Sequence, residues 1–183
     1  MAEDANKMDL RCVKTDMALD IAIRSLLEKR NFGKITVSDI CTSALVSRAA
    51  FYARYTDKYD FFKKWLTRTN FQGLTCDMPY EYLEKVINEF VFKNKIIIKN
   101  IVNESDQETQ DILFQIVLSF LKSKTRPDKL DATPESVIFD RVYSGGLLSY
   151  IFWQVKNNFP SATPPMNKYL YEIIAKYHES EMG

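Results

Sequence analysis

A run of side chains suited to reading DNA bases begins at Ser47. The guanidinium of Arg48 can donate two parallel hydrogen bonds to O6 and N7 of guanine, a contact that discriminates against a wrong base by about 1–3 kcal/mol. Ala49 and Ala50 are small enough for a close approach, and a methyl group can meet the methyl of thymine. The pattern predicts that Ser47, Arg48 and Ala49 face a DNA major groove. Taken alone, Arg48 also fits a solvated surface arginine.

Donors suited to phosphate oxygens lie on both sides of this run. Tyr52 and Tyr55 carry hydroxyls that can donate, and Lys58 places a positive charge near a predicted helix start. Lys34 and Thr36 flank the first of two short predicted helices. We predict that these five residues contact the DNA backbone. A buried tyrosine is the alternative for Tyr52, and a solvated lysine is the alternative for Lys58.

Two short helices and a longer one must position these side chains. Thr36 and Asp39 have the spacing of a capping box, so a short helix is predicted to begin after Thr36. Its inner face would carry Val37, Ile40, Cys41 and Ala44. Ser47 is a second N-cap, opening a helix that buries Phe51, and Asp57 is a third. The helix after Asp57 would present an aromatic-rich face: Phe61, Phe62, Trp65 and Leu66.

A further helix is predicted upstream, from about Lys14 to Lys29. Its apolar residues recur at helical spacing: Met17, Ala18, Ile21, Ala22 and Leu26. Residues 1–10 read as a polar, frayed lead-in, and Gly33 suits a left-handed cap where the helix stops. The four predicted helices in about 60 residues would form a compact unit.

The amino-acid sequence from Ile35 to Lys58 resembles the N-terminal domain of the tetracycline-repressor (TetR) family. ITVSDIC from Ile35 to Cys41, and ALVSRAAFYARYTDK from Ala44 to Lys58, match its pattern of caps, apolar positions, tyrosine and lysine in register. The run from Asp57 to Asp60 is similar to the DhaS-type branch of the family. The resemblance implies an all-α fold with an N-terminal three-helix, homeodomain-like helix-turn-helix unit. It also implies a C-terminal helical domain for ligand binding and dimerisation, about nine helices in all.

Two residues depart from the family pattern. Leu45 stands where the turn usually has glycine, and Tyr55 where it usually has phenylalanine. Because leucine adopts a positive φ only at a steric cost, we expect the turn at Leu45 to use ordinary dihedral angles.

The second half of the chain predicts further helices, ending with one from about Thr163 to Ile174. We divide the chain into a DNA-binding domain, residues 1–70, and an effector-binding and dimerisation domain, residues 71–183. By resemblance, the last two helices form a dimer interface, to which we assign Gly145, Gly146, Leu170 and Ile174. A local kink is the alternative reason for the two glycines. An effector pocket is assigned to Phe114, Phe120, Tyr143, Tyr150 and Trp153, although aromatic residues at helical spacing are more often simply core.

The composition excludes several other classes of site. The three cysteines, Cys12, Cys41 and Cys76, are widely spaced, and the single histidine, His178, has no obvious ligand partners. We therefore expect no metal site, no cofactor and no catalytic residues, and hence not an enzyme. No apolar run approaches the roughly 18 residues of a membrane span, and no signal peptide is seen, so we expect a cytoplasmic protein without membrane contact.

The leading hypothesis is a homodimeric TetR-type regulator, a repressor, that binds a palindromic operator in double-stranded DNA under the control of a small-molecule effector. Activation is an open option. The second hypothesis is a TetR-like interaction module or co-activator that has lost operator binding, motivated by Leu45 and by the net charge of only +1. A helical enzyme or carrier is the third hypothesis, which no nucleophile–base pair or phosphate loop supports.

Overall fold

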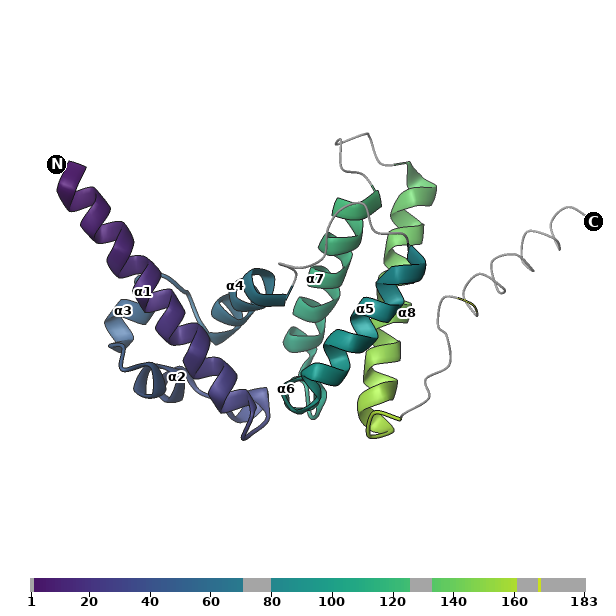
Figure 1. The fold of residues 1–183 in the computed structure, drawn as a ribbon, viewed down its shortest axis with the longest axis horizontal. Coiled ribbons are helices and arrows are strands. Elements are labelled where there is room, and N and C mark those ends of the chain that lie inside the picture. Colours follow the sequence, from purple (N-terminus) through teal and green to yellow (C-terminus); the bar gives the residue numbers. More distant parts are fainter. Residues whose placement is uncertain (1, 71–79, 126–132, 161–167, 169–183) are drawn as a thin grey trace, which may run out of the picture. The chain divides into compact units, whose positions relative to one another are not determined.

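The computed structural model describes residues 2–70, 80–125, 133–160 and 168. Within these ranges there are eight α-helices, one turn of 3-10 helix and no strand, which confirms the all-α prediction (Figure 1). No helix in the described ranges is both long and apolar enough to span a membrane.

The chain forms two compact units, and each is described by itself. The first joins residues 1–70 with residues 96–112, and the second contains residues 71–95 and 113–183. The domain boundary predicted from the sequence, at residue 70, placed residues 96–112 in the C-terminal domain. In the structure these residues belong to the first compact unit. The functional division into a DNA-binding and an effector-binding part stays a prediction.

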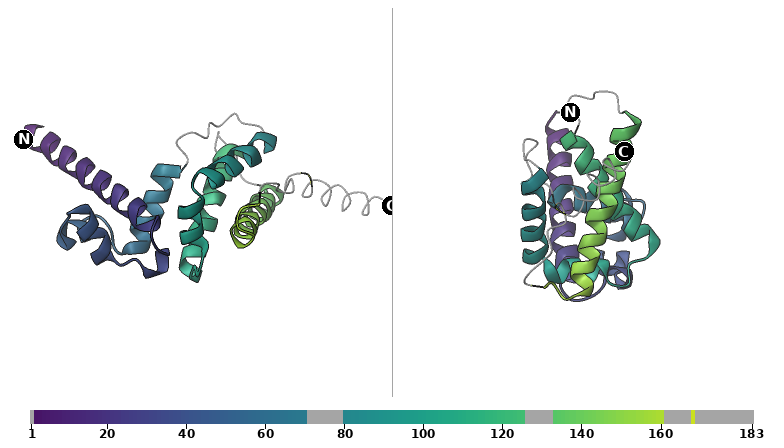
Figure 2. Two further views of the ribbon diagram at one scale, coloured as in Figure 1. Left: turned by 60° about the horizontal axis from the view of Figure 1, so that its bottom comes forward. Right: turned by 90° about the vertical axis from the view of Figure 1, so that its right-hand side faces the viewer.

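Five helices and the 3-10 turn build most of the first unit. In chain order they are α1 (Ala2–Leu27), the 3-10 turn (Phe32–Lys34), α2 (Val37–Ala44), α3 (Arg48–Tyr52), α4 (Lys58–Asn70) and α6 (Lys95–Val102). The helices predicted after Thr36, Ser47 and Asp57 are present. The N-terminal turns of α1 run beyond α2 and α3 (Figures 1 and 2).

Helix α1 differs from its prediction in length and in its buried face. It begins at Ala2, where a frayed lead-in was expected, and it ends at Leu27. No glycine has a positive φ in the described residues, so the left-handed cap predicted at Gly33 is wrong. Met17 and Ile21 are 60% and 71% exposed. The buried face consists of Leu19, Ala22, Ile23 and Leu27, of which only Ala22 belonged to the predicted stripe. Two apolar stripes share this helix with the same period, and periodicity cannot choose between them.

Aromatic rings from consecutive elements form the core beneath the short helices. Phe32 stacks on Phe62 with ring centroids 4.0 Å apart, and Phe51 meets Phe61 edge-on at 5.6 Å. All four rings are almost completely buried. The aromatic face predicted for α4 is therefore confirmed, and it supports α3 through Phe51.

The second unit is built from α5 (Tyr80–Lys93), the later part of α7 (Gln107–Thr125) and α8 (Pro134–Lys156). Its buried cluster joins α7 to α8 through Phe120, Leu121, Tyr143 and Leu147, and Ile87 of α5 packs against it. The predicted helix from Thr163 to Ile174 lies largely outside the described residues, as do Leu170, Ile174, Cys76 and His178.

Candidate nucleic-acid interface

The start of α2 is fixed by the predicted capping box. The Asp39 amide donates to Oγ1 of Thr36 at 3.1 Å, and the Thr36 amide donates to the Asp39 carboxylate at 2.9 Å. Arg30 adds an ion pair to the same carboxylate at 3.0 Å. The hydrogen bonds from Thr36 and then from Arg30 lower the pKa of Asp39 from 3.8 to about 2, so the carboxylate is charged at neutral pH.

The turn between α2 and α3 departs from the expected ordinary dihedrals. Leu45 has φ 55° and ψ 36°, the left-handed conformation that glycine usually supplies. The amide of Val46 donates to the Cys41 carbonyl at 3.0 Å, and the amide of Leu45 donates to the Thr42 carbonyl at 3.3 Å. These bonds satisfy carbonyls that the end of α2 leaves open, which offsets the steric cost. The expectation for this turn was wrong.

Helix α3 begins at the predicted N-cap. The Oγ of Ser47 accepts a hydrogen bond from the Ala50 amide at 3.1 Å. Phe51 points into the core, while Ser47, Arg48, Ala49 and Tyr52 are exposed together on the outer side. The Arg48 guanidinium lies 5.8 Å from the centre of the Tyr52 ring. One face of α3 therefore presents an exposed arginine beside two small residues and a phenol.

Tyr55 does not share this face. It is 3% exposed, and its hydroxyl donates to Asp16 at 2.6 Å. Desolvation, followed by this hydrogen bond, raises the pKa of Tyr55. The prediction of a phosphate contact is corrected on this point, because the ring fills the core position that phenylalanine holds in the family pattern and its hydroxyl already has an acceptor.

The other predicted backbone contacts are partly engaged within the unit. The Lys58 ammonium donates to the carbonyls of Gly33 and Ile35 at 3.3 and 3.4 Å and lies 4.9 Å from the centre of the Phe32 ring. The Thr36 hydroxyl donates to Asp39 at 2.7 Å. Lys34 is exposed but pairs with Glu104 at 3.3 Å.

Sequence reasoning missed two acceptors within residues 96–112, which bind side chains from the 3-10 turn, from the residue before it and from α4. Glu104 accepts from Asn31 at 3.1 Å as well as from Lys34, and it has a φ of 55°. Asp106 accepts from the Tyr59 hydroxyl at 2.5 Å, which together with burial raises the pKa of Tyr59 to about 12. These partners lie 47 to 73 residues apart, and no local pattern marks such pairs.

The predicted effector residues fall in the second unit. Phe120 and Tyr143 belong to its buried cluster, and Tyr150 packs against that cluster. Phe114 lies beside Gly145, 4.0 Å from where a Cβ would stand. Trp153 is 39% exposed and stacks on Tyr150 with centroids 6.2 Å apart. The Tyr150 hydroxyl is buried and has no hydrogen-bond partner among the residues that the structure describes.

The structure offers little to other site chemistries. Cys41 is buried, and burial raises the pKa of its thiol. Across the described part of the chain, no three histidine, cysteine, aspartate or glutamate side chains gather as metal ligands do.

One family of known proteins matches the segment that contains α2 and α3. Residues 21–64 match the family of bacterial regulatory proteins called the tetR family. No curated protein matches the sequence significantly.

Several solved structures resemble the chain, among them two that cover nearly all of its length. A TetR transcriptional regulator from Streptococcus agalactiae superimposes with a TM-score of 0.62 at 20% identity, covering 94% of this chain and 98% of its own. The dihydroxyacetone kinase operon activator DhaS superimposes with a TM-score of 0.53 at 14% identity, covering 91% of this chain and 95% of its own. Residues 21–64 are therefore an N-terminal domain of the tetR family of bacterial regulatory proteins, and the chain as a whole has the fold of a TetR transcriptional regulator.

Proposed function

We propose that the protein is a repressor that binds a palindromic operator as a homodimer and releases it when a small molecule binds. The observation that carries the DNA-binding part is the outer face of α3, where Arg48 and Ala49 are exposed beside the Ser47 N-cap. A helix-turn-helix reads bases with the N-terminal residues of its second helix, which is where these side chains stand.

The proposed backbone contacts surround this face. Tyr52 is 47% exposed and has a hydroxyl that can donate to phosphate. Lys58 uses its ammonium on two carbonyls, and an ammonium has three hydrogens to donate. Lys34 must exchange Glu104 for a phosphate oxygen, and Thr36 must give up its bond to Asp39. Tyr52 and Lys58 therefore need the least rearrangement.

The proposed dimer is supported by an apolar stripe on α8. Ile138, Val142 and Trp153 are 63%, 57% and 39% exposed, and helical spacing puts them on one face with Gly145 and Gly146. Large apolar residues flanking two glycines suit close packing against a helix of a second subunit.

The proposed effector site is supported by the buried Tyr150 hydroxyl. Buried polar groups are normally hydrogen-bonded, so one without a partner calls for a physical explanation. A small, mostly apolar molecule with one acceptor atom would satisfy this hydroxyl beside the rings of Phe120 and Tyr143.

Selection of bound sequences from random double-stranded DNA tests the proposal. We expect the purified protein to enrich a palindrome with half-sites about one helical turn or more apart. Arg48→Ala should lower affinity for that palindrome about tenfold or more and relax the preference at one base pair of each half-site, since a bidentate contact contributes about 1–3 kcal/mol. Lys63→Ala, which removes an exposed charge from α4, is the matched control and should keep the preference.

Failure to enrich any sequence would contradict the proposal. It would favour the alternative, an interaction module or co-activator that keeps the fold without operator binding. An unchanged preference in Arg48→Ala would leave DNA binding intact but contradict the role of Arg48.

A further inference from the structure

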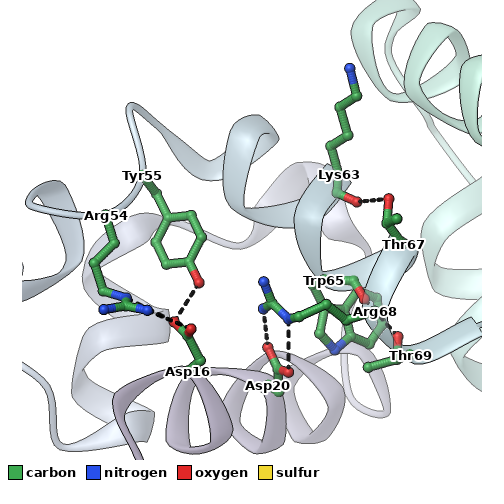
Figure 3. A network of polar contacts seen from close by, with 9 residues as sticks. All are labelled: Asp16, Asp20, Arg54, Tyr55, Lys63, Trp65, Thr67, Arg68 and Thr69. Carbon is green, nitrogen blue, oxygen red and sulfur yellow. Dashed lines mark hydrogen bonds and ion pairs between the residues drawn. The ribbon is translucent and has the colours of Figure 1, made fainter. Parts of the chain in front are cut away.

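A partly buried carboxylate on α1 is bonded to the chain directly after the recognition helix α3. Asp16 accepts two hydrogen bonds from Arg54, from Nε at 2.8 Å and from Nη2 at 2.5 Å. It accepts a third from the Tyr55 hydroxyl at 2.6 Å (Figure 3). The side chains of Asp16 and Arg54 are each only 25% exposed. Three donors from two consecutive residues therefore meet one carboxylate.

The carboxylate is held in its charged form. Burial alone would raise the pKa of Asp16, but the hydrogen bonds from Arg54 and Tyr55 outweigh burial and hold the pKa below 3.8. A bidentate bond between arginine and a carboxylate fixes direction as well as distance, because both groups are planar.

Helix α3 needs such a connection because it is very short. It has five residues, Arg48 to Tyr52, and a helix of that length has no stability of its own in water. The amides of Arg54 and Tyr55 both donate to the Phe51 carbonyl at 3.0 Å, which joins these residues to the backbone of α3. Whatever holds Arg54 and Tyr55 therefore also holds the end of α3.

We propose that Asp16 is a positioning residue for DNA reading, which fixes the angle at which α3 presents Arg48 by holding Arg54 and Tyr55 against α1. The inference rests on the proposed DNA-binding function. Neither Asp16 nor Tyr55 touches the DNA in this arrangement. Their effect on specificity passes through the orientation of α3.

The chain contains a matched control one helical turn further along α1. Asp20 accepts from Nη2 of Arg68 at 2.6 Å and from Nε at 3.4 Å, and these two side chains are 22% and 34% exposed (Figure 3). The residue types, the helix and the burial are similar to those of the first pair. Arg68, however, lies in α4, so this bond ties α1 to the supporting helix. The charge of Arg68 also lowers the pKa of Tyr55, against the larger effect of burial.

The test compares Asp16→Asn with Asp20→Asn in the full chain. Thermal unfolding gives the stability of each variant, and fluorescence titration gives its affinities for the selected palindrome and for a scrambled duplex. We expect both variants to lose similar stability. The ratio of specific to non-specific affinity should fall about tenfold in Asp16→Asn and stay within about twofold in Asp20→Asn, where tenfold corresponds to about 1.4 kcal/mol.

Amide hydrogen exchange distinguishes a local effect at the end of α3 from a general loss of stability. The amides of residues 53–55 should exchange faster in Asp16→Asn than in Asp20→Asn at equal overall stability, since only the first variant frees the end of α3. Asp16→Glu keeps the charge and the two acceptor oxygens, so it should recover part of the lost specificity.

Equal loss of specificity in both variants, or no loss in Asp16→Asn, would overturn the inference. If Asp16→Asn does not fold, Arg54→Lys decides the question, because it keeps the charge and removes the bidentate geometry. A normal specificity ratio in folded Arg54→Lys would then also overturn it. If the unaltered protein enriches no DNA, the proposed function itself fails, and this outcome is distinct from a positioning failure.

Discussion

Leu45 has a left-handed backbone conformation that its side chain disfavours. An L-residue other than glycine adopts the left-handed region at a cost of about 1–2 kcal/mol, and the Leu45 side chain is 95% exposed, so it regains little by packing. A glycine at this position would remove the steric cost and add some entropy to the unfolded chain.

We therefore expect Leu45→Gly to raise the free energy of unfolding by about 0.5–1 kcal/mol, measured by urea denaturation. Leu45→Ala is the matched control, because it removes the exposed side chain but keeps the Cβ that causes the strain. A gain of equal size in Leu45→Ala would show that exposure of the side chain, and not the dihedral angle, is the cost.

Removing a buried hydroxyl usually lowers the free energy of unfolding, but we expect removal of the Tyr150 hydroxyl to raise it. A buried hydroxyl without a partner costs about 1–3 kcal/mol, so Tyr150→Phe should raise the free energy of unfolding by about 1 kcal/mol. Tyr55→Phe removes a part-buried hydroxyl that donates to Asp16, so it should lower the free energy of unfolding by about 1 kcal/mol. Chemical denaturation of both variants measures the difference. Destabilisation by Tyr150→Phe would show that this hydroxyl has a partner in solution.

At the scale of elements, short helices in this protein depend on their caps. Helix α2 has eight residues, and its first turn is held by the reciprocal bonds of Thr36 and Asp39. Because the pKa of Asp39 falls from 3.8 to about 2 on folding, its contribution to stability is fully present above about pH 4 and is lost as the pH falls through about 2.

The pH dependence of stability in the Asp39→Asn variant therefore tests the role of this cap in α2. The stability difference between the unaltered protein and Asp39→Asn should be constant from pH 5 to 7, shrink below about pH 4 and nearly vanish by about pH 2. Circular dichroism at increasing urea concentration measures it at each pH. A difference that persists unchanged at pH 2 would assign the effect to the substitution itself and not to the charge.

At the scale of the whole molecule, the exposed stripe of α8 predicts assembly. Val142→Glu places a charge in the middle of the proposed dimer interface, where burial without a partner is costly. We expect sedimentation velocity to change from dimer to monomer at micromolar concentration. Phe92→Glu, at a residue of α5 that is 64% exposed, is the matched control and should leave the mass unchanged. A dimer in both variants would place the interface elsewhere.

The sequence by itself determined the local features of the N-terminal unit. The caps at Thr36, Ser47 and Asp57 and the inward direction of Phe51 follow from neighbouring residues and helical periodicity, and the all-α fold follows from the resemblance to the TetR family. These interactions span three or four residues, so the local amino-acid sequence is enough to predict them. The exposed position of Arg48 follows in the same way, as it stands on the side of α3 opposite the buried Phe51.

Only the tertiary structure decided the long-range contacts. It buried Tyr55 against Asp16, 39 residues away, paired Lys34 with Glu104, and chose Leu19 and Ile23 over Met17 and Ile21 as the inner face of α1. In each case a residue type fits more than one local role, and the choice depends on which distant segment packs beside it. Hydrophobic periodicity describes the spacing of apolar residues along one helix. It contains no information about which distant segment packs against that helix.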